Sequence, residues 1–265
     1  MIALKQLRRQ NAYINNLGLR EADARIISVR AIEADAQVDA SYSAWPSRPG
    51  QMPLKRLRRS KKIQVQFMIR ELYDLAARNA VLDAVNAWAR DGVLEISARP
   101  DKMAQVIVTK YANAADIRNY TDAYTLEFEA CGVPFWQDKT PARLALSGTE
   151  GSGSLVVGGN VGTVLEAQLT PTEGTLGALT ITATGADGRA ASFAFSGLNV
   201  ASGTTLTITH DAWGVLRIYA GDAGLMGKRA PESADELTIS PGAATVAFEA
   251  DTTVGAVFLA RGWYR

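Results

Sequence analysis

The stretch KKIQVQFMIRELYDLAARNAVLDAVNAWAR, residues 61–90, contains two hydrophobic periods and decides the fold of the first half of the chain. In residues 61–69 every second position from Ile63 to Ile69 is apolar, which is typical of a half-buried β-strand. In residues 71–90 the apolar side chains recur at helical spacing, and Gly92 follows, as at many helix ends. We therefore expect a strand and then an amphipathic helix of about five turns. The apolar helix positions are Leu72, Leu75, Leu82, Val85 and Ala89.

Further strand patterns lie on both sides of this stretch. Four further segments either alternate between apolar and polar residues or are rich in β-branched side chains, as strands are: 25–32, 93–99, 105–111 and 124–130. A Pro-Asp-Lys turn is expected between 93–99 and 105–111. The first half is therefore predicted to be α+β, with the helix packed on an antiparallel sheet.

Charge and glycine content change together near residue 143. Residues 1–143 have a net charge of +6 (22 Lys and Arg, 16 Asp and Glu) and 4 glycines. Residues 144–265 have a net charge of −5 (6 against 11) and 19 glycines. We expect two domains, 1–143 and 144–265, with a linker or entry loop in the Gly/Ser-rich segment 142–160.

The second domain contains only strand patterns, separated by Gly, Pro, Asp and Asn. Their spacing predicts an all-β sandwich or jelly roll. The expected strands are 155–157, 165–171, 178–185, 191–197, 204–211, 214–221, 236–242, 244–250 and 256–264. The chain as a whole is thus predicted to be mainly β.

Composition limits the class of protein. With 47% hydrophobic and 21% charged residues, the 265-residue chain is expected to fold. The single Cys131 excludes an intramolecular disulfide. No apolar segment has the length of a signal peptide core or a membrane span, so we expect neither export nor a membrane partner.

Candidate catalytic residues are few. His210 is the only histidine, and we interpret it as a turn residue beside Asp211 rather than a general base. Glu127 and Glu129 are interpreted as polar positions on a solvated strand face. No HExxH or CxxC spacing exists. We expect no enzyme activity, no metal and no cofactor.

A dense basic cluster precedes the strand 61–69. Its charges are interpreted as a solvated surface or interface rim, with contact to an acidic partner ring or to DNA as alternatives. Aromatic residues are not interleaved with the charges, so sequence-specific nucleic-acid binding is not expected. The candidate interface residues are Lys55, Arg56, Arg58, Arg59, Lys61 and Lys62.

Four aromatic residues of the second domain are candidate sugar contacts, because aromatic faces stack on pyranose rings. Packing in the sandwich core is the interpretation that we favour for them. They are Trp213, Tyr219, Trp263 and Tyr264.

The order of these features resembles the distal tail protein family of phages with long, non-contractile tails. The Arg48-Pro49-Gly50 loop, the helix ending in Trp88 and the Val133-Pro134-Phe135-Trp136 element carry the resemblance in the first domain. Asn160–Thr163, the region Thr207–Gly214, the strand Val215–Tyr219 and the strand-turn Leu237–Gly242 carry it in the second. The basic cluster departs from the family, whose corresponding loop is often Gly- and acid-containing.

The resemblance implies a structural component of the virion, made in the host cytoplasm. It implies a hexameric ring, formed by the N-terminal domain through an extended β-arm, with a galectin-like sandwich projecting outward. The ring would connect the tail tube protein to the hub, tip and receptor-binding proteins of the adsorption device. The alternative is a carbohydrate-binding adsorption module of a phage tail.

Overall fold

The computed structural model describes residues 10–33, 38–44, 51–58, 60–70, 75–113, 123–130 and 132–265, with the backbone alone for 38–44 and 51–58. The chain divides into two compact units, Met1–Phe135 and Trp136–Arg265. The charge and glycine counts change a little later, near residue 143. In the described part of the chain, no helix is long and apolar enough to cross a membrane.

The first unit is built on an antiparallel sheet, with the strand order β2-β1-β7-β8-β9-β6-β3. The predicted strand 61–69 is β6, and its alternating Ile63, Val65 and Phe67 are buried. The elements of this layer are β1 (Ala12–Ile14), β2 (Leu17–Gly18), α2 (Leu19–Ala22), β3 (Ile26–Glu33), β6 (Lys61–Ile69), β7 (Gly92–Ile96), β8 (Arg99–Lys110) and β9 (Tyr124–Ala130).

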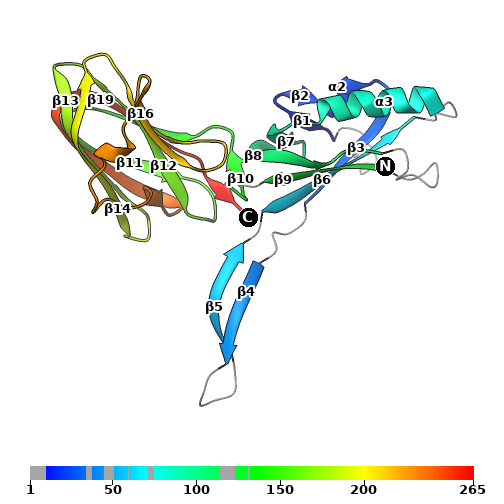
Figure 1. Cartoon of the computed structure of the whole chain (residues 1–265), viewed down its shortest axis with the longest axis horizontal. Helices are drawn as coiled ribbons and strands as arrows, with labels where there is room; N and C mark the ends of the chain where they lie inside the picture. Colours follow the sequence, from blue (N-terminus) through cyan, green and yellow to red (C-terminus); the bar gives the residue numbers. More distant parts are fainter. Residues whose placement is uncertain are drawn as a thin grey trace. The chain divides into compact units, whose positions relative to one another are not determined.

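Helix α3 (Leu75–Trp88) lies across one face of this sheet (Figure 1). Val81, Leu82, Val85 and Trp88 form its buried face. The Trp88 ring packs edge-on against Phe128 of β9, with 6.2 Å between ring centroids. Leu75, which the sequence places on the apolar face, is 56% exposed, so the prediction is wrong for this position, and Leu72 lies outside the described residues.

The turn between β7 and β8 is not at Pro100–Lys102, as the sequence predicts. Ile96 pairs with Arg99, so the turn consists of Ser97 and Ala98, and Pro100 lies inside β8. The ladder shifts register between Leu94 and Ile96. A strand tolerates proline at such an irregularity, because a regular ladder hydrogen bond is not needed there.

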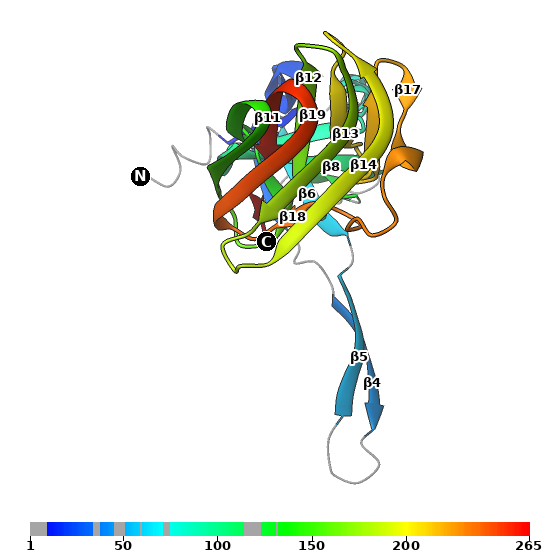
Figure 2. The ribbon, with the colours of Figure 1, turned by 90° about the vertical axis from the view of Figure 1, so that its left-hand side faces the viewer.

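A two-stranded ribbon, which we call the arm, leaves this sheet after Glu33 and returns before Lys61. It consists of β4 (Val38–Ala44) and β5 (Gln51–Arg58), which pair antiparallel with each other. Within the described residues they pair with no other strand, and Figures 1 and 2 show them apart from the sheet. The extended β-arm implied by the family resemblance is confirmed as a feature of the fold.

The second unit contains strands with the order β14-β13-β19-β12-β15-β16-β17, while β11 also pairs with β19 and β18 with β12. Figure 2 shows β13 and β14 beside β19. Its elements are β10 (Trp136–Asp138), β11 (Ala142–Val157), β12 (Thr163–Pro171), β13 (Thr175–Thr184), β14 (Ala190–Ala201), β15 (Leu206–His210), β16 (Leu216–Ala220), β17 (Ala223–Gly224), the 3-10 turn η2 (Met226–Lys228), β18 (Thr238–Ile239), β19 (Gly242–Ala260) and β20 (Trp263–Tyr264).

Strand β19 belongs to both layers of this unit. Its residues 245–250 pair with β13, and its residues 254–260 pair with β12. Side chains of the two layers, such as Phe193 and Phe258, belong to one buried core. The prediction of a mainly-β fold with a C-terminal sandwich is confirmed, although the expected strands 244–250 and 256–264 are largely one strand.

The sequence predicts a linker or entry loop in residues 142–160. Residues 142–157 are instead the strand β11, which is paired with β19 along its length. A register shift between Gly148 and Glu150 marks the bend between its two halves. A Cβ on Gly151 would lie 2.8 Å from Cε1 of Phe248, and one on Gly153 would lie 2.8 Å from Cδ1 of Leu144. These glycines let neighbouring side chains fill the inner side of the bend, which is why a flexible composition forms a strand.

Candidate functional site

The basic cluster is distributed over the arm and its return to the sheet. Lys55, Arg56 and Arg58 belong to β5, opposite Ser41, Ala40 and Val38 of β4. Arg59 lies outside the described residues, while Lys61 and Lys62 begin β6. Three of the six residues of the cluster therefore belong to the arm.

Lys61 departs from the expectation that the whole cluster lies in water. Its side chain is only 8% exposed, and its Nζ lies 2.8 Å from Oε2 of Glu33. Arg99 reaches the same carboxylate, with Nε 2.7 Å from Oε1 and Nη2 3.2 Å from Oε2. A buried ammonium needs such a partner, since an unpaired buried charge is costly. Lys61 is therefore a part of the folded unit, and the exposure predicted for it is wrong.

The neighbouring polar groups on β6 and β9 pair across the two strands. Lys62 is exposed and lies opposite Glu129, whose carboxylate accepts a hydrogen bond from the Ser60 hydroxyl. Gln64 donates through Nε2 to Glu127 at 3.1 Å. Glu127 and Glu129 thus lie in a ladder of polar pairs, which gives them a structural explanation without catalysis.

In the second unit, Trp213 lies on the turn between β15 and β16 and is 58% exposed. The turn is held by Asp211, whose Oδ1 accepts from the backbone N–H of Trp213 (2.9 Å) and Val215 (3.0 Å). Both Nε and Nη2 of Arg217 donate to Oδ2 of Asp211, at 3.1 and 2.9 Å. The Val215 N–H lowers the pKa of Asp211 most, burial opposes it as the next largest effect, and the Arg217 guanidinium and the Trp213 N–H lower the pKa further, so that it lies below its usual value.

Tyr219, 39% exposed, lies on β16 in a row that crosses three strands. Thr207 of β15 is paired with it, and Gln168 of β12 is paired with Thr207. The alternate residues Ile208 and Ile218 are buried, so this row faces away from the core. Core packing, the interpretation favoured from the sequence, is therefore wrong for Trp213 and Tyr219.

Trp263 and Tyr264 lie elsewhere in the fold, on β20. They pair with Gln137 and Trp136 of β10, and both are half-buried. The Tyr264 hydroxyl donates to Asp138 at 3.3 Å, and the backbone of Trp263 bridges to Gly159. Packing accounts for the position of these two aromatic residues.

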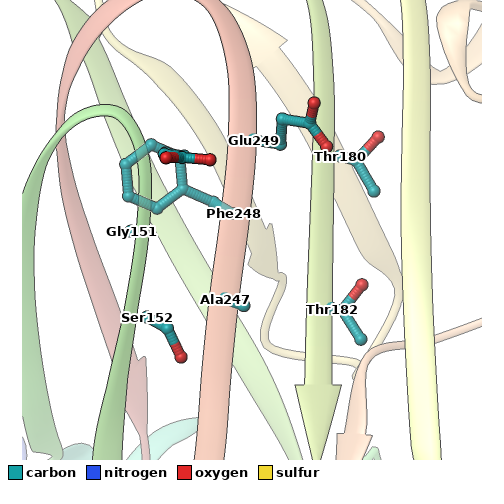
Figure 3. A pocket seen from close by; sticks show the side chains of 8 residues that line it. Gly151, Ser152, Thr180, Thr182, Ala247, Phe248 and Glu249 are labelled. Atoms are coloured by element: carbon teal, nitrogen blue, oxygen red, sulfur yellow. The ribbon is translucent and has the colours of Figure 1, made fainter.

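A groove of about 530 Å³ lies on β11, β13 and β19, on the same strands as the bend (Figure 3). Glu150 and Glu249, which are register partners, line it from β11 and β19, and Thr180 and Thr182 line it from β13. Sequence reasoning missed this groove, because its residues come from three strands that are far apart in the chain. Its lining is both polar and apolar, and Phe248, its aromatic residue, is 4% exposed.

His210 ends β15 with its imidazole almost buried, and its Nε2 lies 4.0 Å from Oε1 of Glu236. Neither ring nitrogen has a hydrogen-bond partner among the described residues, so no hydroxyl or thiol there is placed for activation by it. The described part of the chain also contains no group of three or more His, Cys, Asp or Glu that could hold a metal ion.

Sequence reasoning also missed Glu33 and Arg99. Glu33 follows directly after the predicted strand 25–32, and Arg99 ends the predicted strand 93–99. Opposite charges at the ends of two predicted strands could have indicated an ion pair. The sequence does not show that the two strand ends meet, because this depends on the sheet order β8-β9-β6-β3.

Neither a family model nor a curated protein sequence matches the chain. Among solved structures, the Dit protein of phage SPP1 is similar over 95% of this chain and 98% of its own, with 12% identity and a TM-score of 0.67. Two structures of the phage P2 baseplate in its activated conformation, with Ca and with Sr, match 88% of this chain and 90% of theirs, with 10% identity and TM-scores of 0.47. The chain has the fold of a phage distal tail protein. The structure that shows this fold, SPP1 Dit, is described as a paradigm of the hub adsorption apparatus in phages that infect Gram-positive bacteria.

Proposed function

We propose that the protein is a non-enzymatic structural subunit of a phage tail tip. Its copies form a ring, which is hexameric by the family resemblance, between the tail tube and the adsorption device. The observation that carries the proposal is the similarity to SPP1 Dit over nearly the whole length of both chains. Its partners would be other copies, the tail tube protein and the hub, tip or receptor-binding proteins of the virion.

The arm supports self-assembly on physical grounds. An isolated two-stranded ribbon is marginally stable in water, and both of its edges leave backbone groups without strand partners. A neighbouring subunit would supply those partners. The basic residues Lys55, Arg56 and Arg58 of β5 then act as an interface rim, since charges on an open edge oppose pairing with the wrong chain.

Light scattering after size-exclusion chromatography, with negative-stain imaging, tests this proposal. We expect ring-shaped particles with six times the 28.4 kDa subunit mass. A variant in which a short Gly-Gly connection replaces residues 34–59 should stay folded and monomeric. A wild-type monomer at every concentration, or rings formed without the arm, would contradict the proposal.

Carbohydrate binding by the second unit is the alternative function, and one observation favours it. Trp213 is exposed on a turn that Asp211 holds, while Tyr219 has the hydroxyl of Thr207 on the next strand and the amide of Gln168 one strand further along the same row. Aromatic faces flanked by hydrogen-bonding groups suit sugars. Binding to cell-wall polysaccharide should be lost in Trp213→Ala and kept in Val156→Ala, a matched exposed site on β11. Equal binding by both variants would refute this assignment.

A further inference from the structure

The outer edge of β14 in the second unit is covered by a loop rather than by a further strand. β14 ends the strand order of its sheet, so its outer backbone groups need other partners. We call residues 229–237 the strap; Figure 2 shows this segment in orange beside β14. The Ala230 N–H donates to the Ala194 carbonyl at 2.8 Å, and the Ser233 hydroxyl accepts from the Ala194 N–H at 3.0 Å. The strap therefore protects this edge from pairing with another chain.

The strap also reaches the other layer of the sandwich, at β12 and β15. The carbonyl of Leu237, the last residue of the strap, accepts from the Leu165 N–H of β12 at 2.8 Å. β15, which ends at His210, is the neighbour of β12 in the sheet. Glu236 of the strap thus lies close to the imidazole, with 4.0 Å between its Oε1 and Nε2 of His210.

The imidazole of His210 is buried without a hydrogen bond. Its side chain is 8% exposed, and neither ring nitrogen has a partner among the described residues. Protonation would make both nitrogens donors, and a buried cation needs a counter-charge. The Glu236 side chain is 42% exposed, so it has room to move the remaining distance. A charge-assisted N–H···O bond is about 2.7–2.9 Å long.

Charged groups on the neighbouring elements are held by other contacts. Glu166 of β12 accepts from the backbone N–H of His210 at 3.2 Å, and Asp211 is paired with Arg217 of β16 at 2.9 Å. Arg229 donates to two carbonyls within the strap. Of the described carboxylates, that of Glu236 alone lies within 4.0 Å of the imidazole. It is therefore the counter-charge that a protonated ring would meet.

We propose that His210 and Glu236 form a pH-sensitive latch on the strap. With a neutral imidazole the contact stays open at 4.0 Å, and other contacts hold the strap. With an imidazolium, the Nε2–H donates to Glu236 and ties the end of the strap to β15. The strap should then cover the β14 edge more firmly at about pH 5 than at about pH 8, the range in which imidazoles change charge. The latch lies within the second unit and is independent of the proposed ring.

Hydrogen exchange of the full chain at about pH 5 and about pH 8 tests the latch. Rates are compared as protection factors, so that the intrinsic pH dependence of exchange cancels. Glu236→Gln removes the charge and keeps the shape of the side chain. Glu232→Gln is the matched control, because Glu232 is an exposed carboxylate of the same strap that does not contact the imidazole. His210 is the only histidine, so the imidazole signals in NMR spectra report its protonation directly.

We expect the protection of the Ala230 and Ala234 N–H groups to rise several-fold from about pH 8 to about pH 5 in the wild type and the control, as His210 becomes protonated. In Glu236→Gln this rise should be absent, with circular dichroism unchanged. The latch is overturned by a wild type without the rise, by a rise that persists in Glu236→Gln, by loss of the rise in the control, or by an imidazole that stays neutral. A water bridging the ring and the carboxylate would hold the strap equally at both pH values and so give the first of these results.

Discussion

Substituting Gly151 by alanine tests whether the Gly/Ser-rich segment is a packed strand. The new Cβ would lie 2.8 Å from Cε1 of Phe248, an aromatic ring that is 4% exposed in the core. The ring cannot rotate a terminal group out of the way. Gly153 faces the same side, but its Cβ would meet a terminal methyl of half-buried Leu144, which can move.

The magnitude follows from two opposing effects. Overpacking a core costs about 1–3 kcal/mol, and replacing glycine by alanine returns about 0.4–1 kcal/mol by restricting the unfolded chain. Gly151→Ala should therefore destabilise the second unit by about 1–2 kcal/mol. Gly153→Ala, with a movable neighbour, should be neutral or stabilising by up to about 1 kcal/mol.

Urea unfolding of the full chain measures the difference. Hydrogen exchange of peptides from β13 and β19 reports the second unit separately. Ser152→Ala, on the outer side of the same strand, is the control and should change stability by less than about 0.5 kcal/mol. In a flexible linker the two glycine variants would behave alike. Equal free energies of unfolding for Gly151→Ala and Gly153→Ala would therefore refute the packing argument.

Three further outcomes are expected. Limited proteolysis should spare residues 142–157, because β11 is paired with β19 throughout; early cleavage there would mean that the strand opens. Replacing four basic residues by serine while keeping Lys61 should leave the thermal midpoint of unfolding nearly unchanged but weaken self-association at low salt. Unchanged self-association would show that the cluster is not part of the interface. As the pH falls below about 4, the free energy of unfolding should decrease more steeply in the wild type than in Asp211→Asn. The pKa of Asp211 is lower in the folded than in the unfolded protein, so its stabilising contribution is present above the unfolded pKa and is lost as the pH falls through the folded pKa. Parallel curves of stability against pH would contradict this. The four basic residues are Lys55, Arg56, Arg58 and Lys62.

Local periodicity predicted the elements in which the pattern of buried and exposed residues repeats along the element itself. The alternation of Ile63, Val65 and Phe67 gave β6 its correct bounds, and the helical spacing around Leu82 and Val85 gave the core of α3. Glycine content misled for residues 142–157. The reason is that Gly151 is required by Phe248, which is 97 residues further along the chain and outside any local window.

The candidate sites were predictable only in part. The basic cluster was found from composition, but the burial of Lys61 depends on Glu33 and Arg99, from two other strands. Trp213 was found as an aromatic residue, and its exposure follows from the turn that Asp211 builds around Gly214, whose φ is 77°. A sequence shows which charges and rings exist, whereas the sheet order decides which of them meet.

The long strand β19 has a consequence for the order in which the polypeptide matures. β11, β12 and β13 all pair with it, and some partners, such as Ala142 and Ala260, are more than a hundred residues apart in the chain. On the ribosome, the second unit therefore cannot close its layers until residues 242–260 have emerged. The ladders that join the strands of the path from β2 to β3 to one another use no residue after Ala130, so they can form during synthesis. Since non-local strand pairing is slow, completion of β19 should be a late event in the folding of the second unit.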